Sequence, residues 1–152
     1  MTAEVYTGLR RQVIDLQAEQ LGDEFAQARI LALLMETGYD QAVATLVAVA
    51  DGTTSLYFST GGGIIGAGAH ESVAVASRRW LDAGATFLEQ LEPVADPPVP
   101  APGQTQFVAV TNDGLRAAVA LEGDLGGNRH ALSPLFYAAQ EVITQVRLIE
   151  GG

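Results

Sequence analysis

Apolar residues recur along this chain at helical spacing in some stretches and at strand spacing in others. Residues 2–21 are predicted to form a helix, because apolar side chains there recur at steps of three and four: Val5, Leu9, Val13 and Leu16. Residues 23–38 predict a second helix, with Asp23 as its N-cap and Gly38 as its C-cap residue. Apolar residues on nearly every side of that helix indicate that it is buried.

Two β-hairpins are predicted from apolar strands that flank tight turns. Residues 42–60 form the first, around the Asp-Gly pair at residues 51–52, which is a strong hairpin turn signal. Residues 105–121 form the second, around the Asn-Asp-Gly turn at residues 112–114. Both hairpins join neighbouring strands directly, so the strands are expected to run antiparallel.

Two further helices follow the hairpins. The first covers residues 70–91 and carries Gly84 in its interior, where a close approach by another element would explain the glycine. The second begins at Ser133, an expected N-cap, with Pro134 at its first position. Residues 92–104 hold five of the six prolines and predict a stiff, extended crossing.

The order of elements is therefore ααββαββα, which predicts an α+β fold with a mainly antiparallel sheet of four or five strands flanked by helices. A chain of 152 residues is a single domain by size, with the proline-rich crossing at residues 92–104 inside it. Each hairpin is followed by a glycine-containing loop, a histidine and a helix. This order indicates a two-copy ββα repeat, and chance similarity is the alternative.

Composition and charge exclude several classes of protein. The net charge of −10 argues against binding to nucleic acid or to an anionic membrane surface, because both need a basic footprint. Cysteine is absent, so disulfides and thiolate chemistry are excluded. The N-terminus has no apolar signal-peptide core and no apolar window approaches the length of a membrane span, so we expect a cytoplasmic protein.

The glycine-rich loop at residues 61–68 is the strongest candidate for chemistry. Its first six residues match the G-x-G-x-x-G pattern of dinucleotide sites, but the strand before it comes from a hairpin rather than a βαβ unit. One interpretation is an anion site on free amides at a helix start, and the other is a glycine bulge needed for backbone geometry. The candidate ligand-binding residues are Gly61, Gly62, Gly63, Gly66, Gly68, His70 and His130.

The two histidines, His70 and His130, each lie beside a glycine-rich loop near a predicted helix start. A general base or a metal ligand is one interpretation, and capping or packing of the loop is the other. No metal-binding or nucleophile motif is present around them, and we assign no catalytic residue, no metal and no cofactor.

The order of elements over residues 27–91 and 105–150 resembles the roadblock/dynein-light-chain-7 and longin-like group. That order is helix, hairpin, glycine-containing strand end, long helix, hairpin and helix. The resemblance implies a sheet with a central helix on one face and the terminal helices on the other. The chain is also similar to an uncharacterised family of bacterial proteins with no known activity. Two stretches carry this similarity, LVAVADGTTSLYFSTGGGIIGAGAHE and HALSPLFYAAQEVI.

The roadblock resemblance implies a non-enzymatic regulatory or scaffold protein that works as a homodimer through a sheet edge or a helix face, with a small GTPase as a protein partner. The alternative is a protein that binds a small molecule or an anion, or an enzyme, centred on the loop at residues 61–68 with His70 and His130. A flat apolar face with a self-paired sheet edge favours the first expectation, and a concave polar pocket between the loop and His130 favours the second.

Overall fold

The computed structural model describes residues 3–151, which are built around one seven-stranded sheet in the order β4-β3-β2-β1-β6-β7-β5. All neighbouring strands pair antiparallel, and one isolated parallel bridge joins Gly38 to Pro102. The α+β fold and the antiparallel sheet are therefore confirmed, with more strands than expected. The strands are β1 (Ala32–Gly38), β2 (Val43–Val49), β3 (Thr54–Phe58), β4 (Gly63–Ile64), β5 (Glu92–Val94), β6 (Gln104–Thr111) and β7 (Gly114–Leu121).

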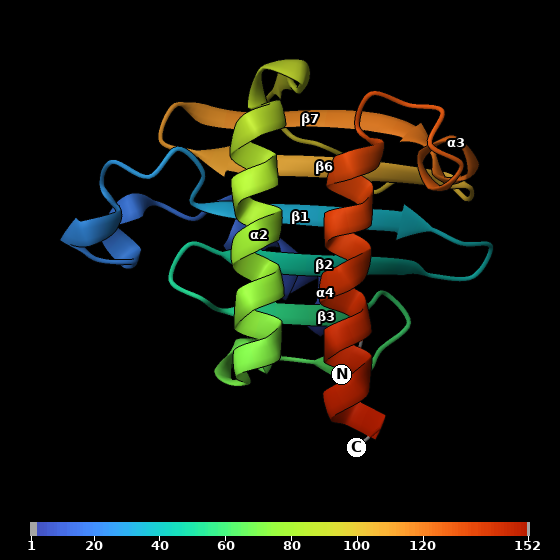
Figure 1. Ribbon diagram of the computed structural model, residues 1–152, viewed down its shortest axis with the longest axis horizontal. Coiled ribbons are helices and arrows are strands. Elements are labelled where there is room, and N and C mark those ends of the chain that lie inside the picture. The colour runs from blue at the N-terminus through green and yellow to red at the C-terminus, as the bar shows by residue number, and fades with distance from the viewer. Residues whose placement is uncertain (1–2, 152) are drawn as a thin grey trace.

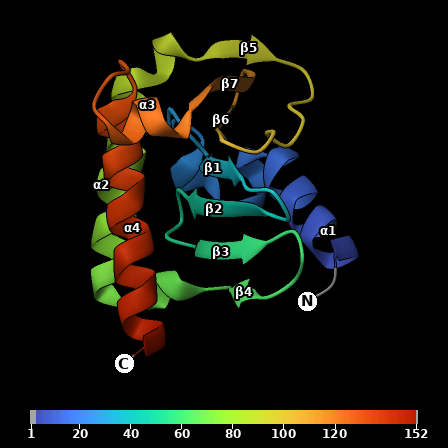
Figure 2. The same ribbon diagram turned by 90° about the vertical axis from the view of Figure 1, so that its right-hand side faces the viewer.

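Helices cover both faces of the sheet. The long helices α2 (Glu71–Phe87) and α4 (Ser133–Gly151) lie side by side across the strands on one face, and α1 (Ala3–Ile14) lies on the other (Figures 1 and 2). Short helices fill the connections: η1 (Ala18–Gln20), η2 (Asp23–Phe25), η3 (Ala67–Ala69), η4 (Leu88–Gln90) and α3 (Glu122–Gly126). The roadblock resemblance implied that the terminal helices share a face, whereas here the central helix and the C-terminal helix do.

The helix predicted over residues 23–38 is wrong. Only the single turn η2 forms there, and the rest of the apolar run becomes β1, the central strand of the sheet. All seven residues of β1 are buried, because helices cover both of its faces. A strand buried on both faces carries no polar alternation, so its sequence is indistinguishable from that of a buried helix. Gly38 ends this strand rather than a helix.

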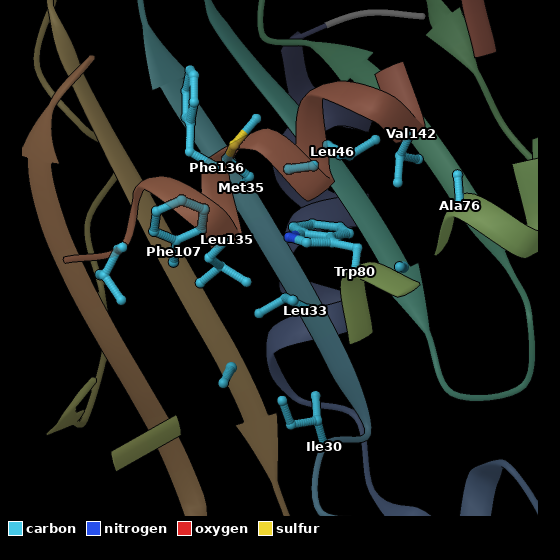
Figure 3. Packing of buried hydrophobic residues seen from close by; sticks show 14 of the residues in the cluster. Ile30, Leu33, Met35, Leu46, Ala76, Trp80, Phe107, Leu135, Phe136 and Val142 are labelled. Carbon is cyan, nitrogen blue, oxygen red and sulfur yellow. The ribbon is translucent and has the colours of Figure 1, made fainter. Parts of the chain in front are cut away.

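The larger core lies between the sheet and the two long helices. Trp80 of α2 is fully buried at its centre and sits above Leu33 of β1, near Phe107 of β6 and Leu135 of α4 (Figure 3). Gly84 lets α2 approach the sheet, since a Cβ at that position would lie 2.8 Å from Cδ2 of Leu33. The expected packing reason for this glycine is therefore confirmed.

Both predicted hairpins form, β2 with β3 and β6 with β7. The two hairpin–helix units are nevertheless not copies of one another. β2 and β6 run in the same direction because both pair antiparallel with β1, yet β3 and β7 lie outside them on opposite sides. The helices that follow the two hairpins, α2 and α4, nevertheless lie on the same face of the sheet (Figure 1). The two hairpin–helix units are therefore related as mirror images, and no rotation superimposes one on the other. The expected two-copy repeat is thus not a structural duplication.

The proline-rich segment returns to the same sheet after α2. It begins as the edge strand β5 beside β7 and reaches Gly38 of β1 through the bridge at Pro102. A Cβ on Gly38 would lie 2.2 Å from the carbonyl oxygen of Ala101, so the glycine is needed for this close approach. The extended crossing expected for residues 92–104 is therefore held directly against the central strand.

Candidate functional site

The glycine-rich loop has a structural reason for each of its glycines. Gly61, Gly62, Gly63 and Gly66 have φ angles of 116°, 84°, 146° and 77°, in the region that side chains other than glycine rarely adopt. A Cβ on Gly68 would lie 2.0 Å from the carbonyl oxygen of Gly52. The loop adds the two-residue strand β4 to the edge of β3 and then leads into α2.

The hydrogen bonds of the loop also connect it to neighbouring backbone. The amide of Gly61 donates to the carbonyl of Phe58, and the amide of Phe58 donates to the carbonyl of Gly62. The amide of Gly66 donates to the hydroxyl of Ser55 at 3.4 Å. These contacts support the interpretation of the loop as a turn that closes a sheet edge, and anion binding there stays a prediction.

The two histidines are placed at opposite edges of the sheet. His70 is exposed and immediately precedes α2, which starts beside the β3 and β4 edge, whereas His130 precedes α4 beside β7 and α3 (Figure 1). The structure therefore does not bring His70, His130 and the glycine loop into one site. Nδ1 of His130 accepts a hydrogen bond from the amide of Leu132 at 3.0 Å, so this histidine organises the start of α4.

The start of α4 differs from the expectation in one respect. Ser133 is the first helical residue rather than the N-cap, and its hydroxyl is buried with no hydrogen-bond partner among the described residues. His130 takes over the capping role because both its ring nitrogen and its carbonyl accept backbone amides, from Leu132 and Ser133.

The densest polar cluster lies between α1 and the sheet, around Glu36 of β1. The Glu36 side chain is completely buried and forms a two-pronged ion pair with Arg10, at 2.7 Å to Nε and 2.9 Å to Nη2. Thr45 donates to the same carboxylate at 3.0 Å, and Gln106 donates to it at 3.3 Å. Each carboxylate oxygen thus accepts two hydrogen bonds, which offsets the cost of burying the charge.

The same cluster holds the proline-rich segment in place. Arg10 Nη2 also donates to the carbonyl of Pro97 at 2.9 Å, and Gln106 donates to the carbonyl of Pro98 at 2.7 Å. Burial opposes the charge of Arg10, but the hydrogen bonds and the charge of Glu36 outweigh it and raise the pKa of the guanidinium. One arginine therefore ties α1, the central strand and the crossing segment together.

Two tyrosines complete this cluster. The rings of Tyr6 and Tyr57 meet edge to face with centroids 5.6 Å apart, and the Tyr6 hydroxyl shares a hydrogen bond of 2.8 Å with Thr45. The Tyr57 hydroxyl is buried without a hydrogen-bond partner among the described residues. Burial, with the nearby charge of Glu36, raises the pKa of both phenols.

Sequence reasoning missed this cluster, although a signal was present. Glu36 is the only charged residue in the apolar run of residues 30–38, and Arg10 follows Tyr6 by one helical turn. A lone carboxylate in a buried run needs a cationic partner. The sequence does not show that this partner lies 26 positions earlier.

Part of the outer edge of β7 has no strand partner among the described residues. β5 pairs with β7 only at residues 115–117, so no described strand pairs with residues 118–121 on that side. Val119 and Leu121 are 50% and 57% exposed, and residues 117–121 carry no charge. Natural edge strands are usually protected by charge, proline or a bulge, and these residues have none of the three.

Comparisons with known proteins give no relatives from which a function could be transferred. No protein-family model, curated protein or solved structure matches this chain. Over residues 3–151, no helix is long and apolar enough to cross a membrane. The described residues form an α+β protein with one antiparallel sheet.

Proposed function

We propose that this chain is a non-enzymatic interaction protein that works as a homodimer joined through the free edge of β7. The observation that carries the proposal is the uncharged, unpaired stretch at residues 118–121, with the exposed side chains of Val119 and Leu121. Strand addition at such an edge combines backbone hydrogen bonds with burial of apolar side chains.

The backbone of this stretch is oriented for strand pairing. The amide of Glu122 donates to the carbonyl of Gly103 in the ladder between β7 and β6. Because alternate residues of an antiparallel ladder point their backbone groups to the same side, Ala118 and Ala120 face β6. Val119 and Leu121 then direct their amides and carbonyls away from β6, toward the open edge.

A second copy matches this edge in an antiparallel register centred on Ala120. In that register Val119 of each copy faces Leu121 of the other, so the outward backbone groups of both residues form hydrogen bonds. The same two side chains become direct cross-strand neighbours and cover each other from water. The symmetry is a closed twofold, so the assembly stops at two chains.

The charged outer positions of α2 and the closed polar cluster are less suited to an interface than the edge of β7. The exposed positions of α2 include Glu71, Arg78, Arg79 and Asp82, which suit contact with water. The densest polar cluster is closed, since Glu36 is completely buried and already has four hydrogen bonds. A catalytic role for that cluster would require an opening that reaches Glu36.

The proposal includes a cytoplasmic location and no binding to nucleic acid or membrane. The net charge of −10 supports the absence of binding to such anionic surfaces. A small GTPase is the partner class that the roadblock resemblance suggests, and it would bind the surfaces that the dimer leaves free.

Cysteine crosslinking tests the dimer and its register together. The chain has no cysteine, so any disulfide in a variant involves the engineered residue alone. Ala120→Cys is expected to give a covalent dimer on mild oxidation, because a non-hydrogen-bonded antiparallel pair has Cα atoms about 4.5 Å apart, within disulfide range. Val119→Cys faces Leu121 of the other copy, so alone it should crosslink much less.

Two controls complete the experiment. Val75→Cys, at an exposed position on α2, should form no covalent dimer under the same oxidation. Light scattering of the unmodified protein should give twice the 15.9 kDa of one chain, and Val119→Lys should return it to a monomer. A monomer at tens of micromolar for the unmodified protein, or equal crosslinking at residues 75 and 120, would refute the proposal.

A further inference from the structure

A groove beside α2 is a mainly apolar hollow of about 380 Å³. One wall is the segment before β1, with Phe25, Ala28 and Ile30, and the other wall is α2, with Leu81 and Ala85. The turn between β2 and β3 closes one end, on the same side of α2 (Figure 1). Its volume falls in the range of small-molecule sites.

Three charged side chains reach the groove. Arg29 and Arg78 line it together with Asp82, so cations outnumber anions there although the whole chain has a net charge of −10. Arg29 already pairs with Glu89 at 3.3 Å, whereas no ion pair is formed by Arg78 among the described residues. Arg78 is thus the cation available to a ligand.

We infer that this groove binds a small amphipathic anion, with an apolar body against Leu81 and Ala85 and a carboxylate or sulfonate head at Arg78. The apolar walls provide burial, and the arginine selects for negative charge. The inference is independent of the proposed dimer, because the groove lies by the β2–β3 turn and the dimer edge lies on β7.

Two fluorescent probes can separate the apolar and the charged contributions. The anionic probe is 1-anilinonaphthalene-8-sulfonate, and its uncharged counterpart is N-phenyl-1-naphthylamine. Trp80 is the only tryptophan and lies on α2 next to Leu81, so energy transfer from it reports that a probe is bound, and the variants below assign that binding to the groove. We expect saturable binding of one anionic probe per chain, tighter than binding of the uncharged probe.

Variants assign the site. Arg78→Gln should weaken the anionic probe about fivefold and leave the uncharged probe unchanged. The matched control is Arg79→Gln, which removes an exposed arginine one position along the same helix and should change neither probe. Ala85→Phe should weaken both probes by filling the groove, and Asp82→Asn should tighten the anionic probe.

Circular dichroism and the urea midpoint of each variant establish that it is folded before its binding is compared. Equal effects of Arg78→Gln and Arg79→Gln would overturn the inference, as would binding that Ala85→Phe leaves intact. Absence of saturable binding would overturn it too. Probe binding that disappears as the protein self-associates would also overturn it, because a second copy would then occupy the groove.

Discussion

Replacing Arg10 with methionine should destabilise the protein strongly, because it leaves the buried carboxylate of Glu36 without its cation. Arg10 provides two of the four hydrogen bonds to that carboxylate. Hydrogen bonds to charged groups contribute about 1.5–3 kcal/mol each, so losing two costs about 3–6 kcal/mol. Breaking buried ion pairs by removing one partner typically costs about 3–5 kcal/mol, which agrees.

A loss of that size is a large part of the total stability of a domain, about 5–15 kcal/mol. Urea unfolding followed by Trp80 fluorescence measures it, since Trp80 is fully buried in the folded state. The matched control is Arg11→Met on the next residue of α1. Arg11 forms only surface pairs with Asp15 and Asp96, so its loss should change the free energy of unfolding little.

The double variant Arg10→Met with Glu36→Leu should regain much of the stability. Without the carboxylate, Thr45 keeps its hydrogen bond to Tyr6, and Gln106 keeps its hydrogen bond to the carbonyl of Pro98. Few buried polar groups therefore lose their last hydrogen-bond partner. The reasoning is refuted if Arg10→Met lowers the free energy of unfolding no more than Arg11→Met does. It is also refuted if the double variant loses as much stability as Arg10→Met and Glu36→Leu lose separately, added together.

Three further predictions concern the loop and the tyrosines. Gly63→Ala should lower the urea midpoint more than Gly62→Ala, because its Cβ would lie 2.4 Å from the carbonyl oxygen of Leu56 whereas a Cβ on Gly62 meets nothing within 4 Å. Tyr57→Phe should be nearly neutral in the same assay because its hydroxyl has no partner, whereas Tyr6→Phe should cost about 1 kcal/mol through its lost hydrogen bond. Because burial raises the pKa of both phenols above 10.0, they stay protonated when folded, and the free energy of unfolding should fall as pH rises above about 10. Ultraviolet absorbance of the tyrosinates and urea titrations across that range check this, and a pH-independent stability would contradict it.

The hairpins could be predicted from the sequence because their signals are local. The Asp-Gly pairs at residues 51–52 and 113–114 fix the turns, and the strands flank them directly. The strand β1 could not be predicted in the same way. Its identity depends on being covered by α1 on one face and by α2 and α4 on the other, which is a property of the assembled sheet.

The partners of Glu36 could not be predicted from the sequence for a similar reason, although the lone carboxylate in an apolar run was a signal. Arg10, Glu36 and Gln106 come from three elements that are distant in sequence, and each residue type alone usually lies on a surface. The glycine loop is the opposite case, because the sequence left both a structural and a ligand-binding interpretation open. Its residues stand together in the sequence and match a ligand motif, but four of the five glycines have positive φ angles, which backbone geometry alone explains.

The two edges of the sheet differ in a way that limits assembly. At one edge, β4 is only two residues long and follows glycines with positive φ angles, which makes it a poor template for a further strand. At the other edge, residues 118–121 of β7 are extended and unpaired on one side. A sheet with two open edges could add strands at both and grow into a fibre, whereas one open edge that pairs with itself closes after two copies. The glycine-rich loop therefore affects the expected assembly. Because the loop covers part of the β3 edge, pairing through the exposed edge of β7 is expected to give a dimer rather than a polymer.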